Sequence, residues 1–259
     1  MSFKRDDDVP SLRFLRVKKD IADIASDPPP GIYVAPEEND ISRIYALVVG
    51  PSGTPYEGGF LLFHLVCSFE YPIKPPRVRF LTTDAGRVAL HPYLYMSGEV
   101  SLSILGTFSG PQWSPAQSLW SLLVSIQSLL THDPFYDRVY YYVEDDKETE
   151  RKVADDYKVY IRHEVIRVAV CGAVESCLES GSSYPAEFRG TVLKLFLEHY
   201  DSYEESVKSH LRVKGEEINY PDVFPRKMSH YEALLARLRD LKAKVEKRVE
   251  SAVPADANQ

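Results

Sequence analysis

The sequence has few cysteines, no long apolar run and no excess of basic residues. Cys67, Cys171 and Cys177 are the three cysteines in 259 residues, too few for a disulfide scaffold, and they suit a reducing compartment. No apolar run reaches the roughly 18 residues of a membrane span, and residues 1–8 lack the apolar core of a secretory signal. We therefore expect a cytoplasmic or nuclear protein without a membrane segment.

Basic residues do not dominate the charge. The 38 acidic residues outnumber the 31 basic ones and give a formal net charge of −7, which argues against a nucleic-acid binder that neutralises phosphates. Hydrophobic residues make up 44% of the chain and charged residues 27%, values typical of a globular protein. The length is that of one domain core with an extension.

The first part of the chain combines a helix pattern with β patterns. Residues 12–25 carry apolar side chains at three- and four-residue spacings, which predicts an amphipathic helix with a basic flank, and the prolines at 28–30 end it. Between residues 32 and 80 the pattern is β, and turn-rich segments separate the runs, so an antiparallel meander is expected. The runs are 44–49, 60–67 and 77–81.

Helices are predicted for the rest of the chain. The segment Ser114 to Gln117 resembles a capping box, with Ser114 as N-cap and Pro115 as the first helical residue of a helix that reaches residue 130. Further helical segments are expected at 145–178, 187–211 and 229–253. The last helix carries an apolar stripe, for which we expect packing on the protein's own body; an intermolecular coiled coil is the alternative. The stripe consists of Leu234, Leu238, Leu241, Val245 and Val249.

Motifs that could carry chemistry are incomplete when judged from the residues alone. The glycine-rich segment 50–59 lacks the Gly-Lys-Ser/Thr of a phosphate loop, and we interpret it as a tight connection between strands. His163-Glu164 lacks a second histidine four residues after His163, because Arg167 stands there. Cys171 and Cys177 lack zinc-site spacing and are interpreted as packed small hydrophobes. No metal site and no cofactor are predicted.

A series of short motifs between Leu12 and Asp137 resembles those of the ubiquitin-conjugating (UBC) enzyme family. In chain order the motifs are Gly50-Pro51 with residues 54–59, then 71–76, His91-Pro92, 98–105, 113–115 and 125–130. The resemblance implies an α+β UBC fold, with an N-terminal helix, a four-stranded antiparallel meander, and central and C-terminal helices. The predicted divisions are a tail at 1–9, a UBC core domain at 10–139, an all-helical extension at 140–253 and a tail at 254–259. The loop 105–113 and the helix 160–171 resemble one branch of the family in particular.

The reaction that the resemblance implies is ubiquitin transfer through a cysteine thioester, which a substrate lysine then attacks. In this sequence Ser101 stands at the family's cysteine position and Tyr93 at its loop-asparagine position. An unassisted serine hydroxyl is far less nucleophilic than a thiol, and Ser101 also lacks the flanking glycines of a nucleophile elbow. His91 lies near in sequence, as a candidate catalytic residue or as a residue that orders the loop.

The resemblance also implies partner surfaces. The expected partners are ubiquitin or a ubiquitin-like modifier, a ubiquitin-activating enzyme of the standard or the non-standard kind, and a ubiquitin ligase. The activating enzyme would contact the first helix at Arg13, Arg16, Lys18 and Lys19. The ligase would contact Ile73, Pro115 and Ala116.

Two hypotheses about function follow, and they differ in the origin of Ser101. The first is a catalytically impaired variant that binds pathway partners as an adaptor or decoy. The second is an active conjugating enzyme in which Ser101 is an engineered trap or another residue serves as nucleophile. Tyr93 favours a natural substitution at Ser101, because a serine engineered to trap the acylated intermediate would need no second change at position 93.

Overall fold

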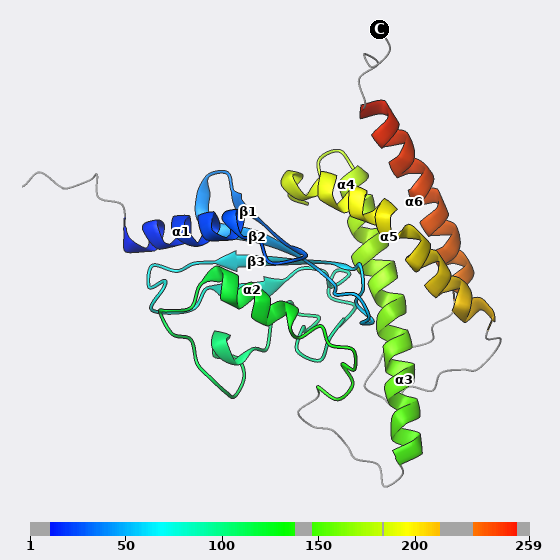
Figure 1. Ribbon diagram of the computed structural model, residues 1–259, viewed down its shortest axis with the longest axis horizontal. Coiled ribbons are helices and arrows are strands. Elements are labelled where there is room, and N and C mark those ends of the chain that lie inside the picture. Colours follow the sequence, from blue (N-terminus) through cyan, green and yellow to red (C-terminus); the bar gives the residue numbers. More distant parts are fainter. Residues whose placement is uncertain (1–10, 138–146, 183, 213–229, 253–259) are drawn as a thin grey trace, which may run out of the picture.

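The computed structural model describes residues 11–137, 147–182, 184–212 and 230–252, and Figure 1 shows the arrangement of the elements. The predicted tails at 1–9 and 254–259 and the predicted boundary at residue 139 lie outside these ranges. The elements in chain order are α1 (Leu12–Ser26), β1 (Ile32–Glu37), β2 (Asp40–Val49), β3 (Phe60–Val66), β4 (Arg77–Phe80), the 3₁₀ turn η1 (Ser103–Leu105), α2 (Leu119–Gln127), α3 (Lys147–Glu164), the π-helical segment η2 (Val165–Gly172), α4 (Ala173–Leu178), α5 (Ala186–Arg212) and α6 (Tyr231–Ala252).

Helix α1 forms where the apolar spacing predicts it. The Ser11 hydroxyl caps the helix by accepting a hydrogen bond from the amide of Phe14, at 3.3 Å. On the inner face Asp20 is almost fully buried, and its carboxylate accepts hydrogen bonds from the Tyr71 hydroxyl and the Leu119 amide. A buried carboxylate is tolerated because these donors replace its water. Asp20 therefore ties α1 both to the loop before β4 and to the start of α2.

The four strands form one antiparallel meander in the order β1-β2-β3-β4, as expected. In its registers Ile44 lies opposite Leu65, and Phe63 lies opposite Phe80. Strand β1 is absent from the β runs that the residues indicate. It includes Pro36, which cannot donate to a strand ladder, and accordingly β1 occupies an edge of the sheet.

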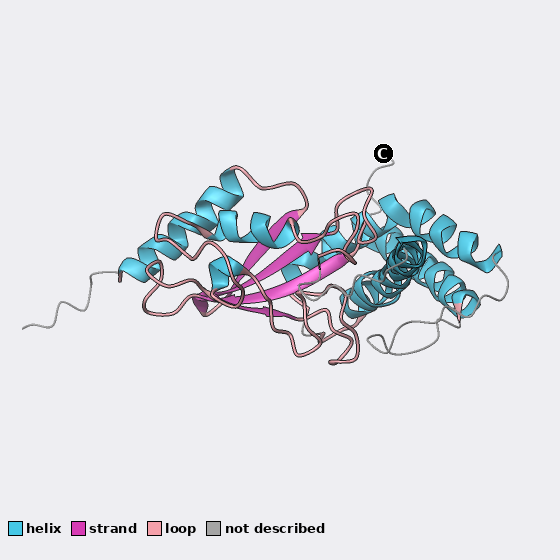
Figure 2. Cartoon of the chain, turned by 90° about the horizontal axis from the view of Figure 1, so that it is seen from below, coloured by secondary structure: helices cyan, strands magenta, loops and turns pink. Residues whose placement is uncertain are grey.

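Helices pack against both faces of the sheet because its side chains alternate between two hydrophobic clusters. Ile44, Ala46 and Phe63 belong to a cluster with α1 and α2. Leu47 and Phe60 belong to a second cluster, which they share with η2, α4, α5 and α6. Figure 2 shows the C-terminal helices gathered at one end of the sheet. The helical extension is thus part of the same body as the meander.

Helix α2 begins at Leu119 and not next to Ser114, so the predicted capping box is wrong. Ser114 and Gln117 do pair, since the Gln117 side chain accepts a hydrogen bond from the Ser114 amide at 2.9 Å, but they close a separate turn. The Arg16 guanidinium donates to the carbonyl oxygens of Pro115 and Gln117 and holds this turn against α1. The real capping box joins Ser118 and Ser121.

In the segment predicted at 145–178, the described residues 147–178 form one continuous helical run. The π-helical stretch η2 interrupts it, which the apolar spacing does not reveal. Residues on α3 and η2 contribute to both hydrophobic clusters, Ile161 and Val165 to the first and Ile166 and Val170 to the second. This run therefore fills the angle between the two cores.

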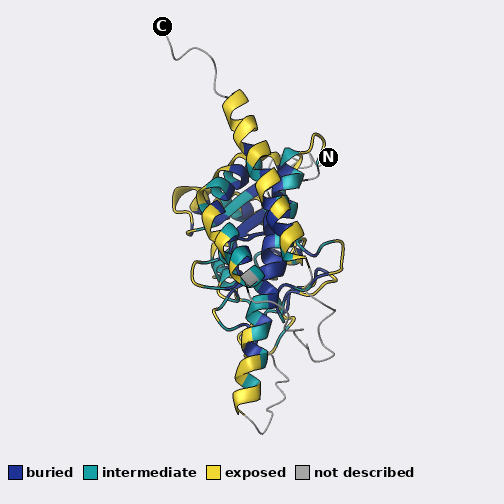
Figure 3. Ribbon diagram, turned by 90° about the vertical axis from the view of Figure 1, so that its right-hand side faces the viewer, coloured by how far each residue is buried: buried dark blue, intermediate teal, exposed yellow. Residues whose placement is uncertain are grey.

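The stripe on α6 packs on the protein's own body, as predicted. Leu238, Leu241 and Val245 are fully buried or nearly so, while Val249 is 45% exposed. Figure 3 shows the C-terminal turns of α6 extending past the rest of the structure as exposed ribbon. Within the described ranges, none of the helices has the length and apolarity that crossing a bilayer requires.

Candidate functional site

The loop between β4 and α2 brings Tyr93 and Ser101 side by side. Isolated β-bridges pair Leu94 with both His91 and Val100, which folds the segment back on itself. The Ser101 amide then donates to the Tyr93 carbonyl oxygen at 2.9 Å. Gly98, at φ +87°, makes the reversal between the two arms in a conformation that L side chains rarely adopt.

Ser101 is buried, and its hydroxyl is engaged. The residue is 6% exposed, and Oγ donates a hydrogen bond to the Thr107 carbonyl oxygen at 3.2 Å. The Thr107 hydroxyl in turn donates to the Val100 carbonyl oxygen at 2.7 Å and accepts from the Leu102 amide at 2.9 Å. The loop is therefore closed over Ser101 by Thr107, a residue that the sequence did not single out.

His91 is held inside the loop by contacts with groups other than Ser101. Its side chain is fully buried, and Nδ1 accepts a hydrogen bond from the Tyr93 amide at 3.0 Å. Nε2 lies 3.5 Å from Asp137 Oδ2, long for a hydrogen bond but within electrostatic reach. Burial lowers the pKa of His91, although Asp137 opposes this effect, so the ring is neutral with its proton on Nε2.

The Tyr93 ring packs into the same cluster. Its centroid lies 5.5 Å from that of His91 and 5.1 Å from that of Phe108. Burial, with Asp137 nearby, raises the pKa of the Tyr93 phenol, which therefore stays protonated. The structure thus brings Ser101, Tyr93 and His91 together in one loop. Within the described residues, no side-chain base contacts the Ser101 hydroxyl.

The three cysteines are buried, as interpreted from the sequence. Burial raises the pKa of each thiol, Cys67, Cys171 and Cys177, to about 12. A thiol with such a pKa carries almost no thiolate at neutral pH and is a poor nucleophile. Cys67 lies just after β3 in the first hydrophobic cluster.

Two of the basic side chains of α1 contact the rest of the protein, and the other two are exposed. Arg13 lies over the Phe69 ring at 4.3 Å, and Arg16 pairs with Asp20 and with the 115–117 turn. Lys18 and Lys19 are exposed, and Lys19 pairs with Asp23 on the next turn. The exposed positive charge of this helix therefore lies mainly on the two lysines.

The apolar residues expected to contact a ligase lie on two loops that touch. The Trp113 indole donates a hydrogen bond to the Pro72 carbonyl oxygen at 2.7 Å and joins the loops. Ile73 is 73% exposed, and Pro115 and Ala116 are exposed as well. The fold thus places these three residues on neighbouring surface loops.

The glycine-rich segment 50–59 is the tight strand connection that the sequence indicates. The Gly50 amide donates to the Gly59 carbonyl oxygen at 2.9 Å, and the Gly58 amide donates to the Gly50 carbonyl oxygen at 3.0 Å. Two side chains of the extension hold it, since the Tyr203 hydroxyl donates to the Gly58 carbonyl oxygen and Arg162 to that of Glu57. In the part of the chain that the structure describes, no three His, Cys, Asp or Glu side chains are grouped to hold a metal ion.

Comparison with known proteins finds one family model and several related chains. The sequence model of the family described as "Ubiquitin-conjugating enzyme" matches residues 16–158. Human ubiquitin-conjugating enzyme E2 G1, a solved structure, is 28% identical with a TM-score of 0.41, and the match covers 47% of this chain and 97% of that one.

Two curated relatives extend the similarity into the helical extension. "Ubiquitin-conjugating enzyme E2 Z" of Xenopus tropicalis is 45% identical over 235 residues, which are 89% of this chain and 71% of the relative. The Homo sapiens protein of the same name is 45% identical over 239 residues, or 91% of this chain and 64% of the relative. The branch resemblance predicted from the 105–113 loop and the 160–171 helix is therefore to the Z type. Since the family model matches more than half of the chain and these relatives align with most of it, the chain belongs to the ubiquitin-conjugating enzyme family.

Proposed function

We propose that this chain is a Z-type member of the ubiquitin pathway that binds pathway partners as an adaptor or decoy without forming a thioester. Ser101 takes the position of the family's catalytic cysteine and Tyr93 that of its loop asparagine. The single observation that carries the proposal is the buried Ser101 hydroxyl, which is engaged with the Thr107 carbonyl oxygen.

The chemistry of Ser101 supports the proposal. A serine hydroxyl attacks an acyl group only when a neighbouring base removes its proton. His91 has its Nδ1 on the Tyr93 amide and its Nε2 toward Asp137, so its contacts leave the Ser101 hydroxyl without a base. If Ser101 were acylated, the product would be an oxyester, which reacts with amines more slowly than a thioester does.

The native cysteines do not favour the alternative of an active enzyme with an unexpected nucleophile. Cys67, the cysteine nearest in sequence to the loop, is 1% exposed with a thiol pKa of about 12. Loading at this position would require the core around β3 to open.

The exposed surfaces support partner binding. Lys18 and Lys19 on α1 would meet a ubiquitin-activating enzyme, either the standard or the non-standard one. Ile73, Pro115 and Ala116 would meet a ligase through a small apolar contact of the kind that transient complexes use. Ubiquitin or a ubiquitin-like modifier would be the third partner.

A charging assay tests the proposal. The chain is incubated with activating enzyme, ATP and ubiquitin, and adducts are compared with and without thiol and with hydroxide. We expect no thiol-sensitive adduct for the natural sequence, and thioester formation for Ser101→Cys. The double variant Ser101→Cys with Tyr93→Asn should load faster if Tyr93 is a second impairment.

A second arm measures binding without relying on loading. The natural chain is titrated into the charging reaction of an active Z-type enzyme, and a decoy should slow that reaction. A thiol-sensitive adduct on the natural chain would contradict the proposal, and so would a failure to slow the reaction. Full substrate turnover by Ser101→Cys with Tyr93 retained would favour the engineered trap.

A further inference from the structure

Ser101 lies between two segments of its loop and forms a hydrogen bond with each. The Ser101 amide donates to the Tyr93 carbonyl oxygen at 2.9 Å, and the Ser101 hydroxyl donates to the Thr107 carbonyl oxygen at 3.2 Å. The ring of Phe108, the residue after Thr107, packs against the Tyr93 ring with centroids 5.1 Å apart. Tyr93, Ser101, Thr107 and Phe108 thus form a closed chain of contacts around position 101.

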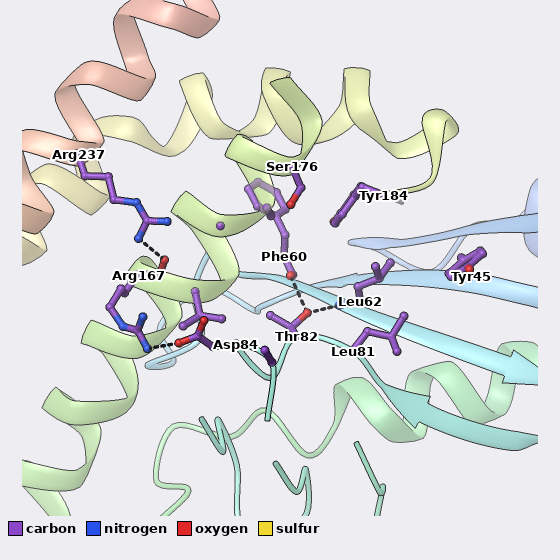
Figure 4. Close-up of a pocket in the computed structure, with 14 residues that line it drawn as sticks. Tyr45, Phe60, Leu62, Leu81, Thr82, Asp84, Arg167, Ser176, Tyr184 and Arg237 are labelled. Carbon is purple, nitrogen blue, oxygen red and sulfur yellow. Dashed lines mark hydrogen bonds and ion pairs between the residues drawn. The ribbon is translucent and has the colours of Figure 1, made fainter. Parts of the chain in front are cut away.

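The segment that carries Tyr93 is firmly anchored. Near its start, Arg167 of η2 pairs with Asp84 at 3.0 Å (Figure 4). Leu90 and Leu94, which lie before and after Tyr93 in the sequence, are fully buried in the first hydrophobic cluster. Residues packed in this way move apart only when the core itself opens. The segment therefore gives the Tyr93 ring a fixed support.

The segment 106–110, on the other side of Ser101, has few buried contacts. Four of its five residues are exposed, and Phe108 is half-buried. The hydrogen bonds of Thr107 go to residues 100–102, whereas the Phe108 ring reaches the anchored segment through Tyr93. Exposed segments with few buried contacts open locally at low cost. We therefore expect the contact between the two rings to decide how often segment 106–110 lifts away.

The Tyr93 ring is the third in a row of rings that begins in the core. Its centroid lies 5.5 Å from that of His91, and the His91 centroid lies 5.9 Å from that of Tyr56. Tyr56 and His91 are almost fully buried. Tilted ring pairs at such separations are favourable. An asparagine at position 93 has no ring and could not join His91 to Phe108.

We propose that Tyr93 is a positioning residue that acts through Phe108 to hold segment 106–110 closed over position 101. This inference rests on the proposed function, in which Ser101 is not loaded. The closure is then a second barrier, in addition to the missing thiol, to an acyl group such as the carboxyl terminus of ubiquitin. The two departures from the family pattern, Ser101 and Tyr93, act on the same step.

The accessibility of a thiol at position 101 measures the closure without any activating enzyme. Ser101→Cys is the parent, and labelling of its added thiol by iodoacetamide is followed by peptide mass spectrometry. Tyr93→Asn in this parent should raise the labelling rate by about 2- to 10-fold, the factor by which the loss of one aromatic pair shifts a closing equilibrium. Tyr93→Phe keeps the ring and should leave the rate close to that of the parent.

A second variant removes the same contact from its other side. Phe108→Leu keeps an apolar side chain without the ring and should raise the rate by a similar factor. Combined with Tyr93→Asn it should add little, because both changes remove one interaction. Tyr95→Asn is the matched control, since Tyr95 is a 45% exposed tyrosine of the same loop, and it should leave the rate unchanged.

Two readouts separate opening of the loop from other effects. Cys67 is 1% exposed, so its labelling in the same sample reports opening of the core. A change in the ionisation of the added thiol would shift the midpoint of the pH profile of labelling, because the thiolate is the reactive form. Opening of segment 106–110 instead raises the rate by the same factor at every pH and leaves Cys67 unlabelled.

The labelling rates decide the proposal. An unchanged rate in Tyr93→Asn, an equal acceleration by Tyr93→Phe or Tyr95→Asn, a shifted pH midpoint that accounts for the acceleration, or multiplying effects of Tyr93→Asn and Phe108→Leu would overturn it. If Tyr93→Asn also exposes Cys67, Phe108→Leu decides alone, and an unchanged rate there overturns the proposal. These rates do not involve ubiquitin, so their failure leaves the decoy function standing. A thiol-sensitive adduct in the charging assay would contradict the decoy function and leave the rates as they are.

Discussion

The Ser101 hydroxyl donates a hydrogen bond to the Thr107 carbonyl oxygen at 3.2 Å. Thr107 also bridges Val100 and Leu102 through its own hydroxyl, so a single residue holds both sides of the loop around Ser101. The Ser101 side chain, which we propose stands at the family's nucleophile position, is therefore enclosed by its neighbours. This closure can be tested apart from any question of ubiquitin transfer.

We predict that Thr107→Val destabilises the protein. Valine keeps the shape of the side chain but removes the donor to Val100 and the acceptor for Leu102. Two lost hydrogen bonds should lower the free energy of unfolding by about 1–3 kcal/mol. Urea denaturation measures the change. Ser109→Ala, at an exposed position of the same loop, is the control and should change stability by less than about 0.5 kcal/mol.

We predict that none of the three native thiols reacts in the folded protein. Cys67, Cys171 and Cys177 are buried and their thiol pKa values are about 12, so a disulfide reagent at pH 8 should modify none of them quickly. All three should react after unfolding in guanidinium chloride. In Ser101→Cys the added thiol should react slowly, and faster when Thr107→Val is combined with it. Rapid labelling of a native thiol without denaturant would contradict the burial argument.

The elements that follow from the sequence are those with local signals. The apolar spacing of 12–25 specifies α1, and alternation with turn residues specifies β2, β3 and β4. The stripe from Leu234 to Val245 correctly indicates packing on the same chain. For the site, the family resemblance singled out Ser101, Tyr93 and His91, and the structure brings these three residues together in one loop, while their roles stay predictions.

The features that the sequence did not reveal depend on tertiary contacts. The turn at Ser114 has a capping-box pattern, yet Arg16 holds its carbonyl groups from α1, so the helix begins at Leu119. Neither the π-helical stretch η2 nor the hydrogen bonds of Thr107 to Val100 and Leu102 produce a periodic pattern in the sequence. The packing of the extension on the sheet joins residues far apart in the sequence, such as Leu47 and Phe196 in the second cluster.

We predict that His91 makes stability depend on pH between about pH 5 and 7. Burial lowers its pKa in the folded state, whereas the unfolded state titrates near the ordinary value of about 6.5. The unfolded state then binds more protons, so the free energy of unfolding falls as pH falls, by at most about 1.4 kcal/mol per pH unit for one proton. Burial raises the pKa of Asp137, but the nearby His91 ring and a hydrogen bond from the Thr131 hydroxyl outweigh burial and lower it, so Asp137 acts only near pH 4 and below, about its ordinary range.

The measurement for His91 is the difference between two pH profiles. Urea unfolding of the natural chain and of His91→Gln is compared at several pH values, and the variant should lose the His91 part of the slope. His132→Gln, which replaces a histidine whose side chain is 69% exposed, is the control. A variant profile parallel to that of the natural chain would show that His91 does not titrate differently on unfolding.

We predict that the two exposed lysines of α1 carry the contact with the activating enzyme. Lys18→Glu combined with Lys19→Glu should raise by about tenfold the concentration at which the chain slows charging of an active Z-type enzyme, a loss of about 1.4 kcal/mol. The effect should weaken at high salt, because exposed charges are screened. Lys194→Glu combined with Lys244→Glu is the matched control, since these two exposed lysines of the extension also pair with acidic residues one helical turn away and the net charge changes equally. Equal effects of both changes would indicate net charge alone.

We predict that the glycine-rich connection cannot accept a side chain at Gly58, because the extension packs directly on it. Gly58 has φ +70°, and a Cβ there would lie 2.5 Å from the Tyr203 hydroxyl oxygen and 2.8 Å from its ring. Gly53 has φ +74° with no described atom within 4 Å of such a Cβ. Gly53→Ala should therefore cost only the backbone strain, about 1–2 kcal/mol, and Gly58→Ala about 1–3 kcal/mol more. Urea unfolding of both variants isolates the steric part as their difference. Equal losses would mean that Tyr203 moves aside freely and that α5 does not hold this connection.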